Sequence, residues 1–139
     1  MKPLIRRANY YETDQMGIIH HSNYIRWFEE ARVEFMEQAD FGYVKAAKAG
    51  IDFALVSLSC EYRSMVRFGD TVHITARITE LRNARMTVEY EVRDLVTDEL
   101  RTTGWTKHCF LDAKLGRPVA LKKVLPELYA VFEGTMSEG

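Results

Sequence analysis

One stretch of the chain has the hydrophobic spacing of a helix that is buried around much of its circumference. Between residues 24 and 39, apolar residues recur at intervals of three and four positions, as on one face of an α-helix. They are Tyr24, Phe28, Ala31, Phe35 and Ala39, and the stripe is widened by Ile25, Trp27 and Met36. We predict a helix at about residues 23–40, with Ser22 or Asn23 as its N-cap and Gly42 after its end.

Elsewhere the hydrophobic period is two, which is typical of half-buried β-strands. The alternating segments lie at residues 56–63, 72–79, 86–92 and about 102–111, and an imperfect first strand lies at residues 3–11. The sequences RFGD, RNAR and VTDEL supply turns between the later strands. Because such short connections cannot hold a parallel crossover, we expect a four-strand antiparallel meander.

This order of elements predicts an α+β domain in which a curved antiparallel sheet of about five strands wraps one long central helix, the hotdog fold. Periodicity alone leaves other α+β arrangements open. We expect one domain over residues 1–139, ending in a short helix at about 122–132 and a flexible tail at 133–139. Cys60 and Cys109 lie in strand segments without metal-ligand spacing, and we expect both to be reduced.

Composition and charge narrow the class of protein. Hydrophobic residues make up 47% and charged residues 28% of the chain, which is typical of a globular protein and argues against disorder. The net charge is −1 and no run of five like charges occurs, so nucleic acid is not the expected partner. No apolar run is long enough for a signal peptide or a membrane span, and we therefore expect a cytoplasmic protein.

The polar groups that could carry chemistry are concentrated at residues 10–24, directly before the predicted helix. A carboxylate there can act on a carbonyl whose oxygen is held by the free N–H groups of the helix N-terminus. Asp14 is the candidate carboxylate, although an Asp before a helix is more often a turn or capping residue. The adjacent His20 and His21 match no zinc spacing, and we predict no metal site.

Seven residues of this loop resemble the signature of the 4-hydroxybenzoyl-CoA thioesterase family of hotdog-fold acyl-CoA thioesterases. They are Tyr10, Asp14, Gly17, Ile18, His21, Asn23 and Tyr24, and the helix sequence WFEEARVEF follows them. The likeness continues through SLSCEYRSMVRFGDTV and so covers most of the chain. It implies hydrolysis of an acyl-CoA thioester to free acid and CoA. That chemistry needs a carboxylate, a water and N–H donors but no cofactor.

The resemblance also implies roles for the matching positions. Asp14 corresponds to the family's catalytic carboxylate, as base or nucleophile, and His21 to the position whose backbone N–H polarises the thioester carbonyl. Tyr10 corresponds to a tyrosine thought to support the carboxylate. The remaining matches, which shape the turn and the helix entrance for substrate, are Gly17, Asn23 and Tyr24.

Two departures from the family pattern leave the acyl group of the substrate open. Many relatives carry a small residue or proline and then glycine after the aspartate, where this chain has Gln15 and Met16. Glu12 stands where many relatives have aspartate. Neither change removes a group that hydrolysis needs.

The carrier of the acyl group suggests further binding residues. Coenzyme A has several phosphates, so basic side chains are expected near the mouth of the site. Arg63 and Arg67 are the candidates, although ordinary solvated strand residues would fit the same pattern. The expected substrates are short-chain, branched or aromatic acyl-CoA thioesters, with a thioester of acyl carrier protein as the alternative.

A homo-oligomer is expected, and two other functions stay open. Seven Tyr, seven Phe and two Trp exceed what one small core hides, and the resemblance implies dimers, often paired into tetramers, with each site at a subunit interface. A hotdog dehydratase or hydratase needs a different arrangement of His and acid, which we do not find. A noncatalytic module that binds acyl chains or carrier proteins is the alternative from another class.

Overall fold

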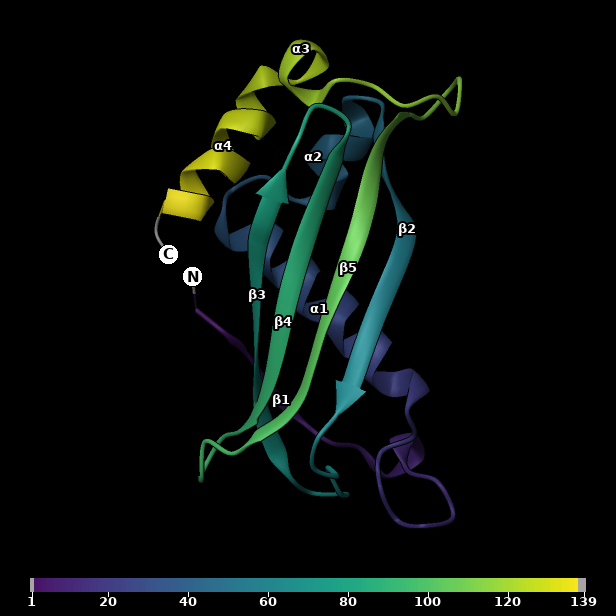
Figure 1. The fold of residues 1–139 in the computed structure, drawn as a ribbon, viewed down its shortest axis with the longest axis vertical. Coiled ribbons are helices and arrows are strands. Elements are labelled where there is room, and N and C mark those ends of the chain that lie inside the picture. Colours follow the sequence, from purple (N-terminus) through teal and green to yellow (C-terminus); the bar gives the residue numbers. More distant parts are fainter. Residues whose placement is uncertain (1, 138–139) are drawn as a thin grey trace.

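A computed structural model describes residues 2–137 of the chain (Figure 1). Its elements, in chain order, are β1 (Leu4–Arg7), a 3-10 turn (Tyr10–Glu12), α1 (Ser22–Gln38), α2 (Tyr43–Lys48), β2 (Ile51–Tyr62), β3 (Thr71–Leu81), β4 (Arg85–Asp94), β5 (Leu100–Asp112), α3 (Leu121–Val124) and α4 (Pro126–Ser137). No helix among these residues is both long enough and apolar enough to cross a membrane.

The strands form one five-stranded antiparallel sheet in the order β1-β3-β4-β5-β2. Figure 1 shows α1 running diagonally behind this sheet, with its first turn beside the end of β2. Alternate residues of β4 face the helix and are buried, namely Met86, Val88, Tyr90 and Val92. The predicted α+β architecture, with one long helix against an antiparallel sheet, is confirmed.

The predicted four-strand meander is wrong at one place, because β2 pairs with β5 and not with β3. Both sides of β3 are occupied by β1 and β4. The connection at residues 63–70 therefore joins β2, at one edge of the sheet, to a strand near the other edge. It packs on the N-terminal segment, where the Ala8 N–H donates to the Asp70 carbonyl at 2.8 Å. Ile18 also forms a bridge with Arg67.

The ends of α1 differ from the prediction. His21 occupies the N-cap position with helical backbone angles, and no side-chain cap bond is present, so neither Ser22 nor Asn23 is the cap. The helix ends before Asp40, which takes the left-handed backbone conformation that Asp tolerates (φ 62°). Gly42 is the N-cap of α2, a helix too short for its hydrophobic period to be recognised in the sequence.

The two ends of the chain also correct the sequence-based boundaries. The strand expected at residues 3–11 is limited to β1, because the backbone turns at Tyr10–Glu12. The C-terminal helix is split into α3 and α4 before Pro126, which lacks an N–H and begins the second helix. Residues 133–137 belong to α4, so the prediction of a flexible tail is wrong for them, and residues 138–139 lie outside the described part.

The sheet and α1 are in close contact at Gly104 in β5. Phe28 of α1 is fully buried and stacks on Tyr90 of β4, with ring centroids 4.4 Å apart and an interplanar angle of 9°. A Cβ atom on Gly104 would lie 2.5 Å from the Phe28 ring and 2.6 Å from the Ser59 carbonyl oxygen. Since backbone and stacked rings cannot yield easily, only glycine fits at this position.

We expect Gly104→Ala to destabilise the protein by roughly 1–3 kcal/mol, because the added methyl group overpacks the contact between Phe28 and the sheet. Gly134→Ala is the matched control, since a Cβ there meets nothing within 4 Å. Alanine in the helix α4 should stabilise by about 0.5–1 kcal/mol. Urea unfolding of both variants measures the two free energies, and equal effects of the two changes would refute the packing argument.

Candidate active site

The loop before α1 is organised around the carboxylate of Glu12, which is 3% exposed. One oxygen accepts hydrogen bonds from Arg6 Nη1 at 2.7 Å and the Asn9 N–H at 2.9 Å, and the other accepts one from Trp27 Nε1 at 2.8 Å. Burial by itself favours the protonated acid, but these three donors outweigh it and hold the pKa of Glu12 below its ordinary value. The carboxylate is therefore ionised and internally paired.

The backbone of Glu12 fixes the entrance to the helix as well. Its carbonyl oxygen accepts from the side-chain amide of Asn23 at 2.9 Å and from the His20 N–H at 2.9 Å. Asn23 is 8% exposed, so its amide is used inside the protein and not toward a substrate. The structure thus makes Glu12 a structural residue of the loop, although the sequence marked it only as a departure from the family pattern.

Asp14 occupies a tight turn at the tip of this loop. Its N–H donates to the Ile18 carbonyl at 2.9 Å, and its own carbonyl accepts from the Gly17 N–H at 3.0 Å. One carboxylate oxygen accepts from the Met16 N–H at 2.8 Å. Gly17 has φ 76°, a left-handed conformation that glycine adopts without strain. Asp14 is partly exposed, and its second carboxylate oxygen has no hydrogen-bond partner within the described residues.

A cavity of about 200 Å³ opens beside Asp14. Four of the predicted site residues line it, namely Asp14, His21, Tyr24 and Arg63. The lining that the sequence did not single out includes Tyr62 and Met65. Tyr62 comes from the end of β2 and Met65 from the connection after it, so no periodic pattern in the sequence associates them with a loop some forty residues away.

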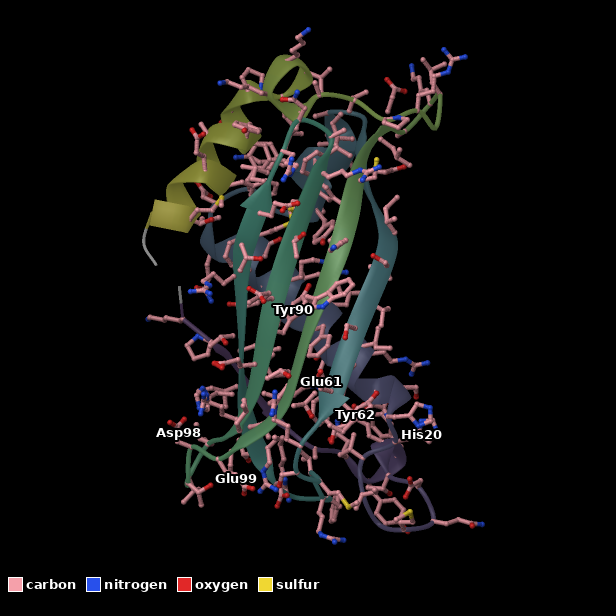
Figure 2. The ribbon with its side chains drawn as sticks, in the orientation of Figure 1. His20, Glu61, Tyr62, Tyr90, Asp98 and Glu99 are labelled. Atoms are coloured by element: carbon pink, nitrogen blue, oxygen red, sulfur yellow. The ribbon has the colours of Figure 1, made fainter. Side chains whose placement is uncertain are left out.

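The N-terminus of α1 faces this cavity through His21. Within residues 2–137 no protein group accepts a hydrogen bond from the His21 N–H. The His21 carbonyl accepts from the Tyr62 hydroxyl at 3.1 Å, and Figure 2 shows Tyr62 at the end of β2 on the side of the first turn of α1. Burial, together with Cys60, raises the pKa of Tyr62, so the hydroxyl stays protonated and remains a donor.

The ring of His20 contacts Ser22, the first residue of α1. Its Nδ1 lies 2.8 Å from the Ser22 hydroxyl and accepts from the Ser22 N–H at 3.2 Å. The His20 and His21 rings pack together, with centroids 4.1 Å apart. No group of three potential metal ligands occurs in the described part of the chain.

The other predicted site residues lie away from the cavity. Tyr10 is 76% exposed, its ring packs edge-on against Phe68, and no hydrogen bond links it to Asp14. The backbone N–H of Arg67 donates to an Asp70 carboxylate oxygen at 2.9 Å, and its side chain does not line the cavity. The expected support of Asp14 by Tyr10 and a phosphate contact by Arg67 therefore have no counterpart in this geometry.

A larger hollow of about 560 Å³ lies over β3, β4 and β5. It contains Trp105, Glu89 and Glu91 but none of the predicted site residues. It combines no nucleophile with a helix N-terminus. The candidate active site is for this reason the smaller cavity at Asp14.

Residues 9–130 match the family model described as the thioesterase-like superfamily. This chain belongs to the thioesterase-like superfamily. The match covers the Asp14 loop, α1 and the whole sheet after β1. It confirms the predicted relationship with the hotdog-fold thioesterases.

Solved structures and curated relatives agree with the superfamily assignment. The crystal structure of a hypothetical protein from Aquifex aeolicus is 35% identical, with a TM-score of 0.85 over 94% of this chain and 98% of that one. The DHNA-CoA thioesterase of Staphylococcus aureus is 26% identical, with a TM-score of 0.92 over 98% of this chain and 91% of that one. The acyl-CoA thioesterase YbgC of Haemophilus influenzae is 24% identical over 127 residues, 91% of this chain and 90% of its own.

Replacing Glu12 tests the role assigned to the buried carboxylate. Glu12→Gln should destabilise the protein by about 2–4 kcal/mol at neutral pH, because a neutral amide leaves buried donors without their charged acceptor. The folded-state pKa of Glu12 is lowered, so its contribution is complete above the ordinary value of 4.5 and is lost as the pH falls through the folded value. The difference between native protein and variant should therefore shrink below about pH 4.5.

Glu30→Gln is the matched control for this measurement. Glu30 and Glu12 both pair with Arg6, at 2.9 Å and 2.7 Å. The side chain of Glu30 is 46% exposed, unlike that of Glu12. Its replacement should cost less than about 1 kcal/mol. Urea unfolding at several pH values gives both differences, and a pH-independent loss in Glu12→Gln would contradict the assignment.

Proposed function

We propose that this protein is a thioesterase that hydrolyses acyl-CoA to a free acid and CoA. The observation that carries the proposal is that Asp14 and His21 line the same cavity, and that the His21 N–H at the start of α1 has no acceptor among residues 2–137. The names of the relatives from S. aureus and H. influenzae, both CoA thioesterases, support the same reaction class. The carrier is proposed to be CoA, with acyl carrier protein as the alternative.

In the proposed mechanism the thioester carbonyl oxygen binds at the His21 N–H. This N–H and the dipole of α1 stabilise the negative charge that develops on the oxygen during attack. Asp14 either attacks the carbonyl carbon or removes a proton from the attacking water. When Asp14 acts as the base, the C–S bond breaks, the thiolate of CoA takes up the proton that Asp14 removed, and the water supplies the oxygen of the acid product. When Asp14 attacks, the thiolate leaves a mixed anhydride of the acyl group with Asp14, and water then breaks the acyl–Asp14 bond, supplies the proton for the thiolate and restores the carboxylate.

The turn at Asp14 suits this role. The Met16 N–H holds one carboxylate oxygen at 2.8 Å and so restricts the rotation of the side chain. The other oxygen is left for the substrate or the water. Tyr62 holds the His21 carbonyl at 3.1 Å and keeps the first turn of α1 in place. Preorganisation of this kind is what lets N–H donors stabilise charge without rearranging.

Arg63 is the proposed contact for the phosphates of CoA, because it alone of the two predicted arginines lines the cavity. Arg63 Nη2 lies 3.3 Å from Glu61 Oε2, and both side chains are exposed. A phosphate of CoA can therefore replace Glu61 as the partner of Arg63. The cavity of about 200 Å³ suits the short-chain, branched or aromatic acyl groups expected from the sequence. Its two tyrosines, Tyr24 and Tyr62, meet with ring centroids 5.2 Å apart.

A homo-oligomer is proposed from the free edge of β2. This strand pairs on one side only, with β5, so its other side carries unpaired backbone groups. It also exposes Val56, at 62%, where the pairing with β5 is irregular. A long exposed edge with apolar side chains is a template for pairing with a second chain. We propose that two β2 strands meet in a dimer, and that the protein acts in the cytoplasm.

The test is release of free thiol from a panel of acyl-CoA substrates by native protein and by Asp14→Asn. Asparagine keeps the size of the side chain and can still accept from the Met16 N–H. We expect activity to fall by at least about 10²-fold in a folded variant, because the carboxylate is lost. The acyl group with the highest kcat/KM then defines the substrate.

Asp98→Asn is the matched control, because Asp98 lies at the turn between β4 and β5 and does not line the cavity; Figure 2 labels it across the sheet from His20. Its replacement should leave thiol release unchanged. A native protein that releases no thiol from CoA or acyl carrier protein thioesters would favour the noncatalytic binding module. A fully active Asp14→Asn would exclude Asp14 as the catalytic group.

A further inference from the structure

A polar cluster lies in the interior between α1 and the sheet, away from Asp14. Arg32 of α1 donates to the Tyr43 hydroxyl from Nε and to the Tyr90 hydroxyl from Nη1, both at 2.9 Å. The Tyr90 hydroxyl is 2.6 Å from the Thr106 hydroxyl, which in turn is 2.9 Å from His108 Nε2. The proposed mechanism uses none of these groups.

Two groups of this cluster, among the described residues, lack partners that they could bind. Within the described part of the chain no carboxylate forms an ion pair with Arg32, and its Nη2 makes no hydrogen bond. His108 is 1% exposed and its Nδ1 has no partner. Burial and the charge of Arg32 lower the pKa of His108 to about 4, so the imidazole is neutral at pH 7. The cluster therefore carries the single positive charge of Arg32.

An incompletely covered apolar strip connects this cluster with the candidate active site. Leu58 and Leu55 lie opposite Thr106 and His108 in the pairing of β2 with β5, so they share the face of the sheet that α1 packs on. Tyr62, which lines the cavity at Asp14, lies on the same face farther along β2. Both leucines remain exposed because α1 covers the middle of the sheet and leaves β2 open.

The distance from the candidate active site to the Arg32 cluster can be estimated along α1 and along β2, and the two estimates are similar. Along α1, Arg32 lies eight positions after Tyr24, a distance of about 12 Å at 1.5 Å per residue. Along β2, Leu58 lies four positions before Tyr62, a distance of about 14 Å at 3.4 Å per residue. Tyr62, near the end of β2, and Tyr90, in the middle of the sheet, mark the two ends of the strip and are labelled in Figure 2. An extended chain of roughly ten bonds covers such a distance.

We propose that Arg32 and Tyr43 form a second subsite, which binds a carboxylate at the far end of the acyl group. The preferred substrates are then CoA monothioesters of medium-chain dicarboxylic acids. This inference rests on the proposed thioesterase function and replaces the short-chain, branched or aromatic acyl groups proposed above with a longer class, because the chain continues beyond the cavity at Asp14. The methylene chain lies on the strip of Leu55 and Leu58, with the thioester at Asp14.

The chemistry of the cluster favours a carboxylate over a neutral group. A partly buried guanidinium without an acidic partner is unfavourable, and a carboxylate supplies both the missing charge and acceptors for its free N–H groups. Since the Tyr43 oxygen accepts from Arg32 Nε, its own hydroxyl hydrogen is free to donate as well. The donors at this end thus converge on an anionic acceptor, as in fork-like pairing of arginine with carboxylate.

The test compares kcat/KM for hexanedioyl-, octanedioyl- and decanedioyl-CoA with the values for hexanoyl-, octanoyl- and decanoyl-CoA. For native protein we expect at least one dicarboxylic thioester to exceed its monocarboxylic counterpart by about tenfold or more. Arg32→Met should remove that preference, so that kcat/KM for each dicarboxylic thioester falls to or below the value for its monocarboxylic counterpart. Arg32→Lys, which keeps the charge, should restore part of it.

Arg77→Met is the matched control, because Arg77 is exposed on the opposite face of β3. Thermal unfolding monitors the fold of each variant, and Tyr43→Phe, which removes one donor, replaces Arg32→Met if the latter does not fold. Equal kcat/KM for the two substrate series in native protein would overturn the subsite, as would an equal fall of kcat/KM for both series in Arg32→Met. If Arg32 instead pairs with a carboxylate of a second copy of the chain, the two series should have equal kcat/KM.

The failure of this inference can be told from failure of the proposed function. If native protein hydrolyses monocarboxylic acyl-CoA in an Asp14-dependent way but shows no preference for dicarboxylic thioesters, the thioesterase function stands and the subsite falls. If no thioester of either series, nor any aromatic acyl-CoA, is hydrolysed, both fall.

Discussion

The buried carboxylate of Glu12 holds together the segments from which the candidate site is built. It binds Arg6 of β1, the backbone of Asn9 in the loop and Trp27 of α1. An ionised carboxylate is stable inside a protein only when donors replace the water that it loses, and these three partners meet that need. The turn that presents Asp14 to the cavity therefore depends on a residue that does not touch the cavity.

The position of α1 determines where a substrate can lie. Phe28 and Tyr90 stack against each other, and Gly104 lets the helix approach the sheet. Because α1 packs over the middle of the sheet, β2 is left with an open face and an open edge. The edge offers backbone groups to a second chain, and the face joins the cavity at Asp14 to the cluster at Arg32. The proposed dimer contact and the proposed path of the substrate thus use the same uncovered strand.

Much of the fold could be predicted from local patterns. The spacing of apolar residues located α1, and alternation located β3, β4 and β5, because these elements bury one face along their whole length. The strand order could not be predicted. β2 lies at the edge and its apolar residues are largely exposed, so its pattern carries no information about its neighbour. The short α2 and the last turn of α4 were missed because neither forms a repeating pattern.

For the site, the sequence by itself determined the loop of residues 10–24, with its carboxylate, its close turn at Gly17 and its position at the start of α1. These features depend on neighbouring residues, and local sequence is enough to specify them. Only the tertiary structure decided that Tyr62 lines the cavity, that Tyr10 lies outside it, and that Arg32 meets Tyr90 with no acidic partner among the described residues. Such contacts join segments far apart in the chain, and they form only because burial of the shared core brings α1 and the strands together.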